Sequence, residues 1–133
     1  MLVAVADTHS VLWYVYNDQR LSPVARALMQ SAAEDGHQIG VSSISFAEMV
    51  YLEEKGRIQS GVLDRVIHGI RQPDAVLTEL QVSHVTAEMM TEIPRTAIPD
   101  LPDRIIAATA LVHRVPLITR DRMIVSSGIE TIW

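Results

Sequence analysis

The sequence predicts an α/β fold with a central parallel sheet that is covered by helices on both faces. Short, almost wholly apolar runs alternate along the chain with longer segments of helical periodicity, which is the pattern of parallel βα units. No repeat, low-complexity tract or linker interrupts the 133 residues. We therefore expect one domain over 1–133, a length at which folding buries about two-thirds of the surface of the unfolded chain.

The first half of the chain predicts two strands and four helices. Leu2–Ala6 is an apolar run typical of a buried strand, and Val11–Tyr16 belongs to a first helix. Ser22 as N-cap and Pro23 at the first helical position predict a second helix that ends near Glu34. The elements expected next are a strand at Ile39–Ser42, a helix at Ser45–Lys55 that Gly56 closes, and a helix at Ser60–Ile70 with its apolar residues on one face.

The second half predicts three further strands separated by helices. Pro94 ends one helix, and the proline-rich stretch Ile98–Pro102 predicts a loop before the next one. Arg104–His113 then predicts a strongly apolar helix. The remaining elements are strands at Val76–Val82, Pro116–Thr119 and Glu130–Trp133, and helices at Thr86–Ile93 and Asp121–Ser126.

The composition excludes several classes of protein. With 48% hydrophobic and 20% charged residues, the chain is not disordered. No apolar run approaches the roughly 18 residues of a membrane-spanning helix, and Leu2–Ala6 lacks the basic leader of a signal peptide, so we expect a cytoplasmic protein without a membrane segment. The absence of cysteine excludes disulfides, thiol nucleophiles and zinc–thiolate sites.

The charged residues do not exclude a nucleic-acid substrate. A net charge of −5 argues against a general electrostatic attraction to nucleic acid. However, Lys55 is the only lysine among 11 basic residues, and arginine is preferred where planar pairing with phosphate or carboxylate matters. A chain that gathers its acids in one site can be acidic overall and still bind phosphate locally.

Four carboxylates fall just after a predicted strand or at the start of a predicted helix. They are Asp7, Glu48, Asp103 and Asp121. In an open parallel sheet the carboxyl ends of the strands face one edge, and ligand sites form there where the strand order reverses. We therefore expect these four acids, which come from four distant segments, to converge in one cleft.

Each of these acids also has a local explanation as a helix cap. Ser45-Phe46-Ala47-Glu48 matches a capping box, and Asp7, Asp103 and Asp121 stand where an aspartate can cap a helix. Capping accounts for each acid singly, but caps have no reason to converge on one place. One carboxylate can also serve both purposes.

Converging carboxylates predict a site for a divalent cation. They repel one another and lie partly out of water, so they either retain protons at a raised pKa or bind a cation. With oxygen ligands alone, Mg²⁺ or Mn²⁺ is the natural occupant, and the chemistry that follows is metal-assisted phosphodiester hydrolysis. Removing the four charges and that of nearby Asp100 would bring the net charge to zero, so the acidity of the chain is about that of one such site.

A series of short segments occurs in a fixed order over nearly the whole chain. It comprises Asp7-Thr8-His9, Leu12-Trp13-Tyr14, Arg20-Leu21-Ser22-Pro23, Val41-Ser42 with Ser45-Phe46-Ala47-Glu48, Asp100-Leu101-Pro102-Asp103-Arg104 with Ile105–Ala110, Pro116-Leu117-Ile118-Thr119-Arg120-Asp121, and Ile132-Trp133. The ordered set resembles PIN-domain nucleases, specifically the VapC-type toxins of bacterial toxin–antitoxin pairs.

The resemblance implies a fold, partners and a set of site residues. The implied fold is a three-layer α/β/α sandwich, and the implied assembly is a homodimer bound by an antitoxin whose tail plugs the acidic cleft. Asp7, Glu48, Asp103 and Asp121 would hold one or two divalent metals and activate water for cutting RNA. Thr119 and Thr8 would support the site, and Asp100 matches an outer aspartate of the family.

Residues near the expected site have both functional and structural explanations. Arg120 and Arg122 flank Asp121 and are either contacts to RNA phosphate or solvated surface residues. His9 is close enough to the expected site to approach a substrate, but it is expected to be an ordinary helix residue. Trp13, Tyr14 and Tyr16 could stack on bases, but they are expected in the core or at a subunit interface. The methionines are expected to fill the core, although Met49 with Val50 and Leu52 could line an antitoxin groove.

Two functional hypotheses follow. The first is a Mg²⁺- or Mn²⁺-dependent endoribonuclease toxin, and the alternative is a non-catalytic PIN-like binding module with a decayed acidic site. The presence of all four acids favours the nuclease. Phospho-acceptor and nucleotide-binding folds are excluded, because the chain has no Asp-x-Asp signature at Asp7, no late lysine and no glycine-rich phosphate loop.

Overall fold

The computed structural model describes residues 1–133 and contains one five-stranded sheet in which all neighbouring strands are parallel. The strand order is β3-β2-β1-β4-β5. All five strands lie where the sequence predicts them, although the last three are shorter than expected. Their bounds are β1 Leu2–Ala6, β2 Gln38–Ser42, β3 Leu77–Leu80, β4 Leu117–Ile118 and β5 Thr131–Ile132.

Seven helices connect the strands, as the alternation of patterns predicts. No helix has both the length and the apolar character needed to cross a bilayer. The bounds of the helices are α1 Thr8–Val15, α2 Pro23–Glu34, α3 Ser43–Glu54, α4 Val62–Ile70, α5 His84–Met90, α6 Leu101–His113 and α7 Arg122–Ser126.

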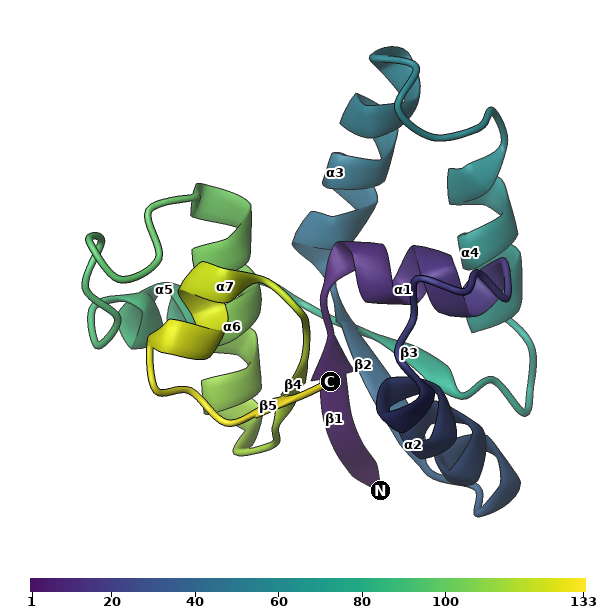
Figure 1. The fold of residues 1–133 in the computed structure, drawn as a ribbon, viewed down its shortest axis with the longest axis horizontal. Coiled ribbons are helices and arrows are strands. Elements are labelled where there is room, and N and C mark those ends of the chain that lie inside the picture. The colour runs from purple at the N-terminus through teal and green to yellow at the C-terminus, as the bar shows by residue number, and fades with distance from the viewer.

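The helices cover both faces of the sheet and give the molecule three layers. Side chains alternate along β1, so that Ala4 and Ala6 join a buried cluster with α1, α2 and α4, whereas Val5 joins a second cluster with α6 and α7. Figure 1 shows α5, α6 and α7 on one side of the strands and α1, α2 and α4 on the other. The expected three-layer α/β/α sandwich is confirmed.

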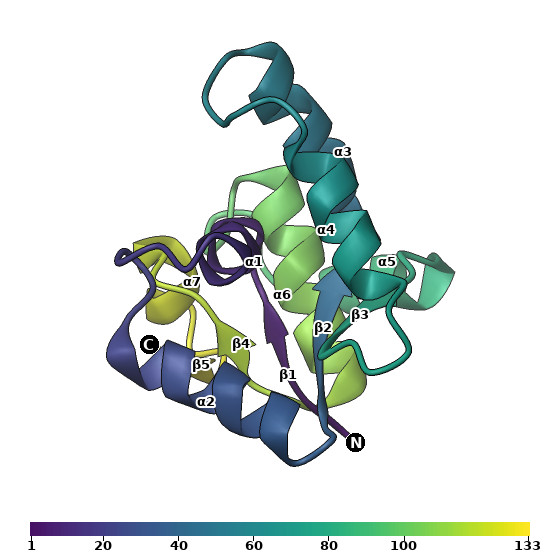
Figure 2. The ribbon, with the colours of Figure 1, turned by 90° about the vertical axis from the view of Figure 1, so that its right-hand side faces the viewer.

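The strand order reverses at β1, and this reversal creates a crevice at the carboxyl ends of β1 and β4. From β1 the chain adds β2 and then β3 on one side, and it later adds β4 and β5 on the other (Figure 2). The backbone N–H of Asp7 donates to the carbonyl of Ile118 at 3.1 Å, so β1 and β4 stay paired up to their last residues. Such a crevice is the usual place for a ligand in this class of fold.

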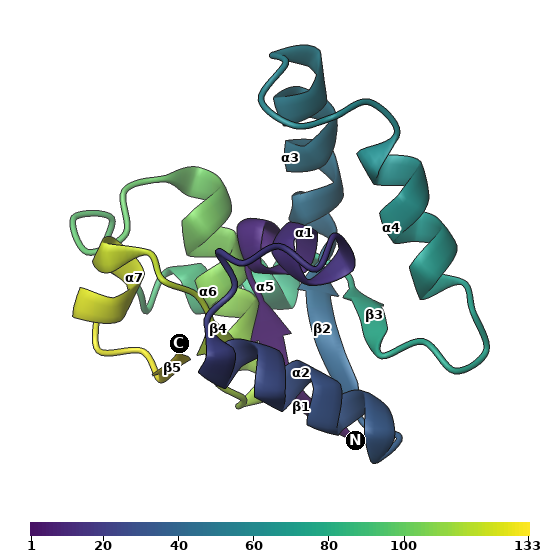
Figure 3. The same ribbon diagram turned by 45° about the vertical axis from the view of Figure 1, so that its right-hand side comes forward.

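Helix α3 leaves the end of β2 at this edge and projects beyond the sheet, and α4 returns beside it (Figures 1 and 3). Its start corrects one prediction. Ser42 is the N-cap, because its side chain accepts from the Ile44 N–H, and α3 begins at Ser43. Ser45 and Glu48 therefore lie inside the helix, and the predicted capping box is wrong.

Helix α6 also begins earlier than predicted. Asp100 caps it, and the Asp100 carboxylate accepts from the Asp103 N–H at 3.1 Å. The loop predicted at Ile98–Pro102 is therefore too long, and Asp103 is in the first turn rather than at the N-cap. The reason is that proline is tolerated in the first turn, so Pro102 is the second residue of this helix instead of preceding it.

The residues that precede three other helices determine where those helices start. The first helix starts at Thr8 and includes most of the predicted helical segment Val11–Tyr16, and its N-cap is Asp7, as the sequence suggested. Ser83 and Thr86 form a capping box that starts α5 at His84, two residues before the predicted Thr86. Gly61, with a φ of +86°, precedes α4, so that helix starts at Val62. The predicted caps Ser22 and Asp121 are confirmed.

Candidate functional site

A cleft of about 750 Å³ opens at the carboxyl ends of β1 and β4, where the strand order reverses. Its walls include side chains from α1, α3, α6 and the turn after β4. The structure thus brings to one cleft the acids that the sequence places in distant segments. The acids that line it are Asp7, Glu48, Asp103, Asp121 and Asp100.

Asp7 is the most firmly held of these acids. It follows β1 directly, and its Oδ1 accepts from the Ser10 N–H at 2.9 Å, which caps α1. Its Oδ2 accepts from the Thr119 Oγ1–H at 2.6 Å. Each oxygen keeps a lone pair free, so Asp7 caps a helix and can still bind a ligand.

Thr119 is a buried support that joins two of the acids. It follows β4, has no exposed surface and does not line the cleft. Its hydroxyl donates to Asp7 and accepts from the Asp121 N–H at 3.0 Å. Asp121 in turn caps α7 by accepting from the Ile124 N–H at 3.0 Å. One threonine therefore fixes the spacing between the acids after β1 and β4.

Glu48 is held by a chain of hydroxyl groups inside the protein. The Thr8 Oγ1–H donates to Glu48 Oε1 at 2.5 Å, and the Ser45 Oγ lies 2.8 Å from the Thr8 Oγ1. A hydroxyl has one proton, so while Thr8 donates to Glu48 it must accept from Ser45. Thr8 and Ser45 are both buried. This chain explains why Ser45, which the sequence suggested as a cap, faces Thr8 instead.

Two carboxyls in the cleft have raised pKa values, because several carboxylates lie close together in a partly buried space. Burial raises the pKa of Asp103 to about 7, and the charges of Asp100, Asp121, Glu48 and Asp7 add to the effect. Burial also raises the pKa of Glu48, which the Thr8 hydrogen bond partly opposes. Both shifts follow from placing several carboxylates in a partly desolvated space.

None of these acids forms an ion pair within the protein, although Arg57 and Arg120 line the same cleft. The only ion pair in the structure joins Arg20 to Asp18, outside the acidic group. Oxygen donors without a basic partner fit a hard divalent cation. No three acidic or histidine side chains are close enough together to hold one ion as they stand. That does not oppose Mg²⁺, which usually keeps several waters and binds one or two carboxylates together with substrate phosphates.

The rest of the cleft wall contains residues that the sequence did not single out, including Tyr51 and Arg57, beside others that it did. Tyr51 and Leu52 stand one turn beyond Glu48 on α3, and Arg57 follows that helix. The spacing of Tyr51 from Glu48 places both on one helix face, and this signal could have found it. Nothing in the sequence pattern marks Arg57. Arg120, Trp13 and His9 also line the cleft.

Several secondary expectations can now be assessed. Trp13 is buried, as predicted for a core residue, and His9 is exposed on α1 at the cleft wall. Met49 has no exposed surface, which confirms its expected place in the core and excludes it from an antitoxin groove. Its position on α3 turns it into the core, whereas the adjacent Val50 is exposed.

Comparison with known proteins assigns the family. Residues 4–126 match the family model of the PIN domain. This match spans most of the chain, and the chain therefore belongs to the PIN-domain family. Within that family it is similar to Ribonuclease VapC22 of Mycobacterium tuberculosis (strain ATCC 25618 / H37Rv), with 30% identity over 122 residues that cover 92% of this chain and 89% of the relative.

Solved structures share the fold. VapBC2 from Rickettsia felis, bound to a DNA fragment from its promoter, superposes with a TM-score of 0.71 at 15% identity, covering 98% of this chain and 97% of the other. A toxin–antitoxin complex from Klebsiella pneumoniae gives a TM-score of 0.59 at 25% identity, covering 89% of this chain and 86% of the other.

Proposed function

We propose that this protein is a Mg²⁺- or Mn²⁺-dependent endoribonuclease that acts as the toxin of a toxin–antitoxin pair. The observation that carries the proposal is the convergence of Asp7, Glu48, Asp103 and Asp121, from four segments, on one cleft without a basic partner. The similarity to Ribonuclease VapC22 and the fold shared with toxin–antitoxin complexes support it.

Each residue of the site has a proposed role that follows from its contacts. Asp7, Asp103 and Asp121 are the proposed carboxylates of the metal site, which would hold one or two divalent cations directly or through water, and Thr119 fixes the first and last of them. A bound divalent cation would acidify the attacking water and neutralise charge on the phosphoryl oxygens. Glu48 is either a further ligand or the base that orients the water, and Thr8 stabilises its ionised form.

The test is cleavage of a mixed cellular RNA pool by the wild-type protein, with Mg²⁺ or Mn²⁺ and then with EDTA. The decisive variant is Asp7→Asn, because asparagine caps a helix as well as aspartate does and α1 should stay intact. Asp74→Asn is the matched control, since Asp74 is exposed and lies outside the cleft. We expect metal-dependent cleavage by wild type and Asp74→Asn and none by Asp7→Asn.

Metal binding separates the proposal from its alternative. A protein that neither cuts RNA nor binds Mn²⁺ in calorimetry would be the non-catalytic binding module. Cleavage by Asp7→Asn at the wild-type rate would contradict the assignment of the site even if the nuclease activity is real. Cleavage that persists in EDTA would contradict the metal.

An antitoxin protein is the proposed partner. Its tail, carrying an arginine, would enter the cleft and pair with the carboxylates, none of which forms an ion pair within the protein. The partner can be tested with the product of a neighbouring gene, which should form a stable complex and suppress cleavage. A complex that leaves cleavage unchanged would contradict this mode of inhibition. We also propose a homodimer, which light scattering on the purified protein measures directly.

A further inference from the structure

Arg120 lies on the cleft wall, and its cationic side chain has no hydrogen-bond or ion-pair partner in the protein. It stands directly before Asp121, is exposed and lines the acidic cleft. Its guanidinium donates no hydrogen bond to the protein and forms no ion pair, although five carboxylates share the same cleft. All five of its N–H donors are therefore available to a ligand in the cleft.

This guanidinium nevertheless lies over an aromatic ring of the protein. Its central carbon lies 4.5 Å from the centre of the Trp13 ring, within the range of a cation–π contact. Trp13 is only 6% exposed and packs edge-on against Trp133, with ring centres 5.9 Å apart. Trp13 is part of α1, whose N-cap is Asp7, so the arginine lies over the helix that starts at the first acid of the site.

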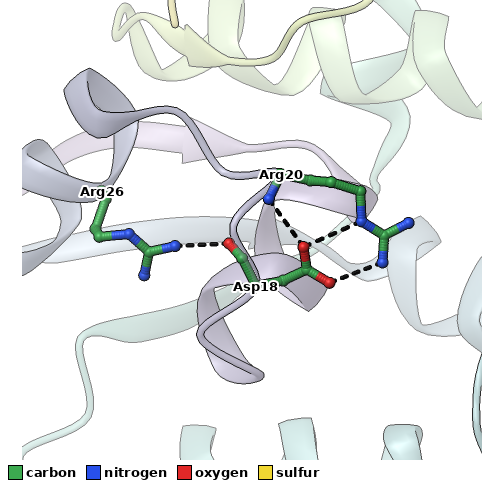
Figure 4. A network of polar contacts seen from close by, with 3 residues as sticks. All are labelled: Asp18, Arg20 and Arg26. Carbon is green, nitrogen blue, oxygen red and sulfur yellow. Dashed lines mark hydrogen bonds and ion pairs between the residues drawn. The ribbon is translucent and has the colours of Figure 1, made fainter.

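Arg20 provides an internal contrast, because it also lies over Trp13 but its charge is neutralised. Its central carbon is 5.4 Å from the centre of the Trp13 ring. Figure 4 shows its guanidinium paired with both carboxylate oxygens of Asp18, at 3.1 and 2.7 Å. The hydrogen bonds from Arg20 lower the pKa of Asp18 to about 2. Of the two arginines on this indole, one is bound within the protein and the other faces the cleft.

We propose that Arg120 binds a backbone phosphate of the RNA strand next to the acidic residues, and that Trp13 is its positioning residue. The inference rests on the proposed nuclease function and names a residue that engages the substrate at that site. An acidic cleft repels a polyanion, so a substrate strand needs local cations to enter it. A planar guanidinium with free donors matches the oxygens of a phosphate in a bidentate way.

The test measures RNA binding without cleavage. A fluorescein-labelled single-stranded RNA of mixed sequence is titrated with protein in EDTA, and the dissociation constant is obtained from anisotropy at several salt concentrations. We expect Arg120→Gln to weaken binding about tenfold and to reduce the salt slope by about 0.7, as for one lost phosphate contact on a single strand. Arg122→Gln is the matched control, since Arg122 is exposed, lies two residues away and does not line the cleft.

Arg120→Lys tests the contact between the Arg120 guanidinium and the Trp13 ring. Lysine keeps the charge but lacks the planar group that lies over Trp13. We expect this variant to keep the salt slope of the wild type and to bind with an affinity between those of wild type and Arg120→Gln. In a Trp133→Phe background, where Trp13 is the only indole, RNA should change the tryptophan emission in a manner that Arg120→Gln abolishes.

The outcomes separate this inference from the nuclease. Wild-type affinity and salt slope in Arg120→Gln would overturn it even if the wild-type protein cuts RNA. Equal losses in Arg120→Gln and Arg122→Gln would overturn it as well, because they would indicate a general charge effect. Arg120-dependent binding by a protein that cuts no RNA would support the phosphate contact and contradict the proposed nuclease.

Discussion

Thr119 and Asp7 are 112 residues apart in the sequence, and the Thr119 hydroxyl donates to the Asp7 carboxylate at 2.6 Å. This bond crosses the point where the strand order reverses, since Asp7 follows β1 and Thr119 follows β4. The same hydroxyl accepts from the Asp121 N–H. A single side chain therefore ties two of the four proposed site acids to each other.

Thr119→Val tests this relationship, because valine keeps the shape of threonine and removes the hydroxyl. We expect a loss of about 1–3 kcal/mol of unfolding free energy, since the Asp121 N–H loses its acceptor. RNA cleavage should fall further than stability alone explains, because Asp7 loses one of the two hydrogen bonds that orient it. Urea denaturation and the cleavage assay measure the two effects. Thr119→Ser retains the hydroxyl and should preserve most of both, and cleavage by Thr119→Val at the wild-type rate would contradict the role.

Thr8 is expected to control the protonation of Glu48. Its hydrogen bond favours the ionised carboxylate, so Thr8→Val should raise the pKa of Glu48 further. If ionised Glu48 is required, the acidic limb of the profile of kcat/KM against pH should move to higher pH. Thr8→Ser should leave the limb in place. A profile that does not move in Thr8→Val would exclude Glu48 as the group that titrates.

The metal-free protein is expected to lose stability as the pH rises. Folding raises the pKa of Asp103 from 3.8 to about 7, so between these values the folded state binds more protons than the unfolded state. The unfolding free energy therefore falls as the pH increases through this window and levels off above it. Urea denaturation in EDTA, at about pH 5 and about pH 8, measures the difference.

Asp103→Asn should remove much of that pH dependence. At about pH 8 in EDTA we expect the variant to be more stable than wild type by about 1 kcal/mol, after screening by solvent is allowed for. It should also be inactive, which would make it a case of stability gained at the expense of function. A variant less stable than wild type under these conditions would show that the charges in the cleft do not repel strongly.

Asp100 is expected to act mainly as a helix cap and as a neighbouring charge. Asp100→Ala should cost about 1 kcal/mol of unfolding free energy, whereas Asp100→Asn keeps the cap on α6. Both variants remove a charge that raises the pKa of Asp103. We expect both to cut RNA better than Asp103→Asn does. Complete inactivity of Asp100→Asn would instead place Asp100 among the essential acids.

The sequence was sufficient to predict the sheet, its helices and the convergence of the acids. Apolar runs such as Leu2–Ala6 are visible without tertiary information, and the carboxyl ends of parallel strands must share an edge. What the sequence could not resolve was the choice among neighbouring caps. Ser42, Ser43 and Ser45 are all competent, and the end of β2 together with the contact between Ser45 and Thr8 decides among them.

The sequence patterns also could not predict interactions between distant segments. The patterns around Trp13 and Arg120 are compatible with a core aromatic and a surface arginine. Only the packing of the first helix against the turn after β4 places one over the other. For a related reason the sequence left two places open for Met49, the core and a groove, because α3 contacts both the sheet and α4 and its buried face does not follow from apolar spacing alone.

The most direct test of the central claim is the binding of Mn²⁺ to the metal-free protein, measured by calorimetry on wild type, Asp7→Asn and Asp74→Asn. If the acids that converge at the ends of β1 and β4 form a cation site, Mn²⁺ binds to wild type and to Asp74→Asn, and binding is lost or greatly weakened in Asp7→Asn. Equal binding to all three proteins would contradict the account, because the cation would then be held outside the acidic cleft.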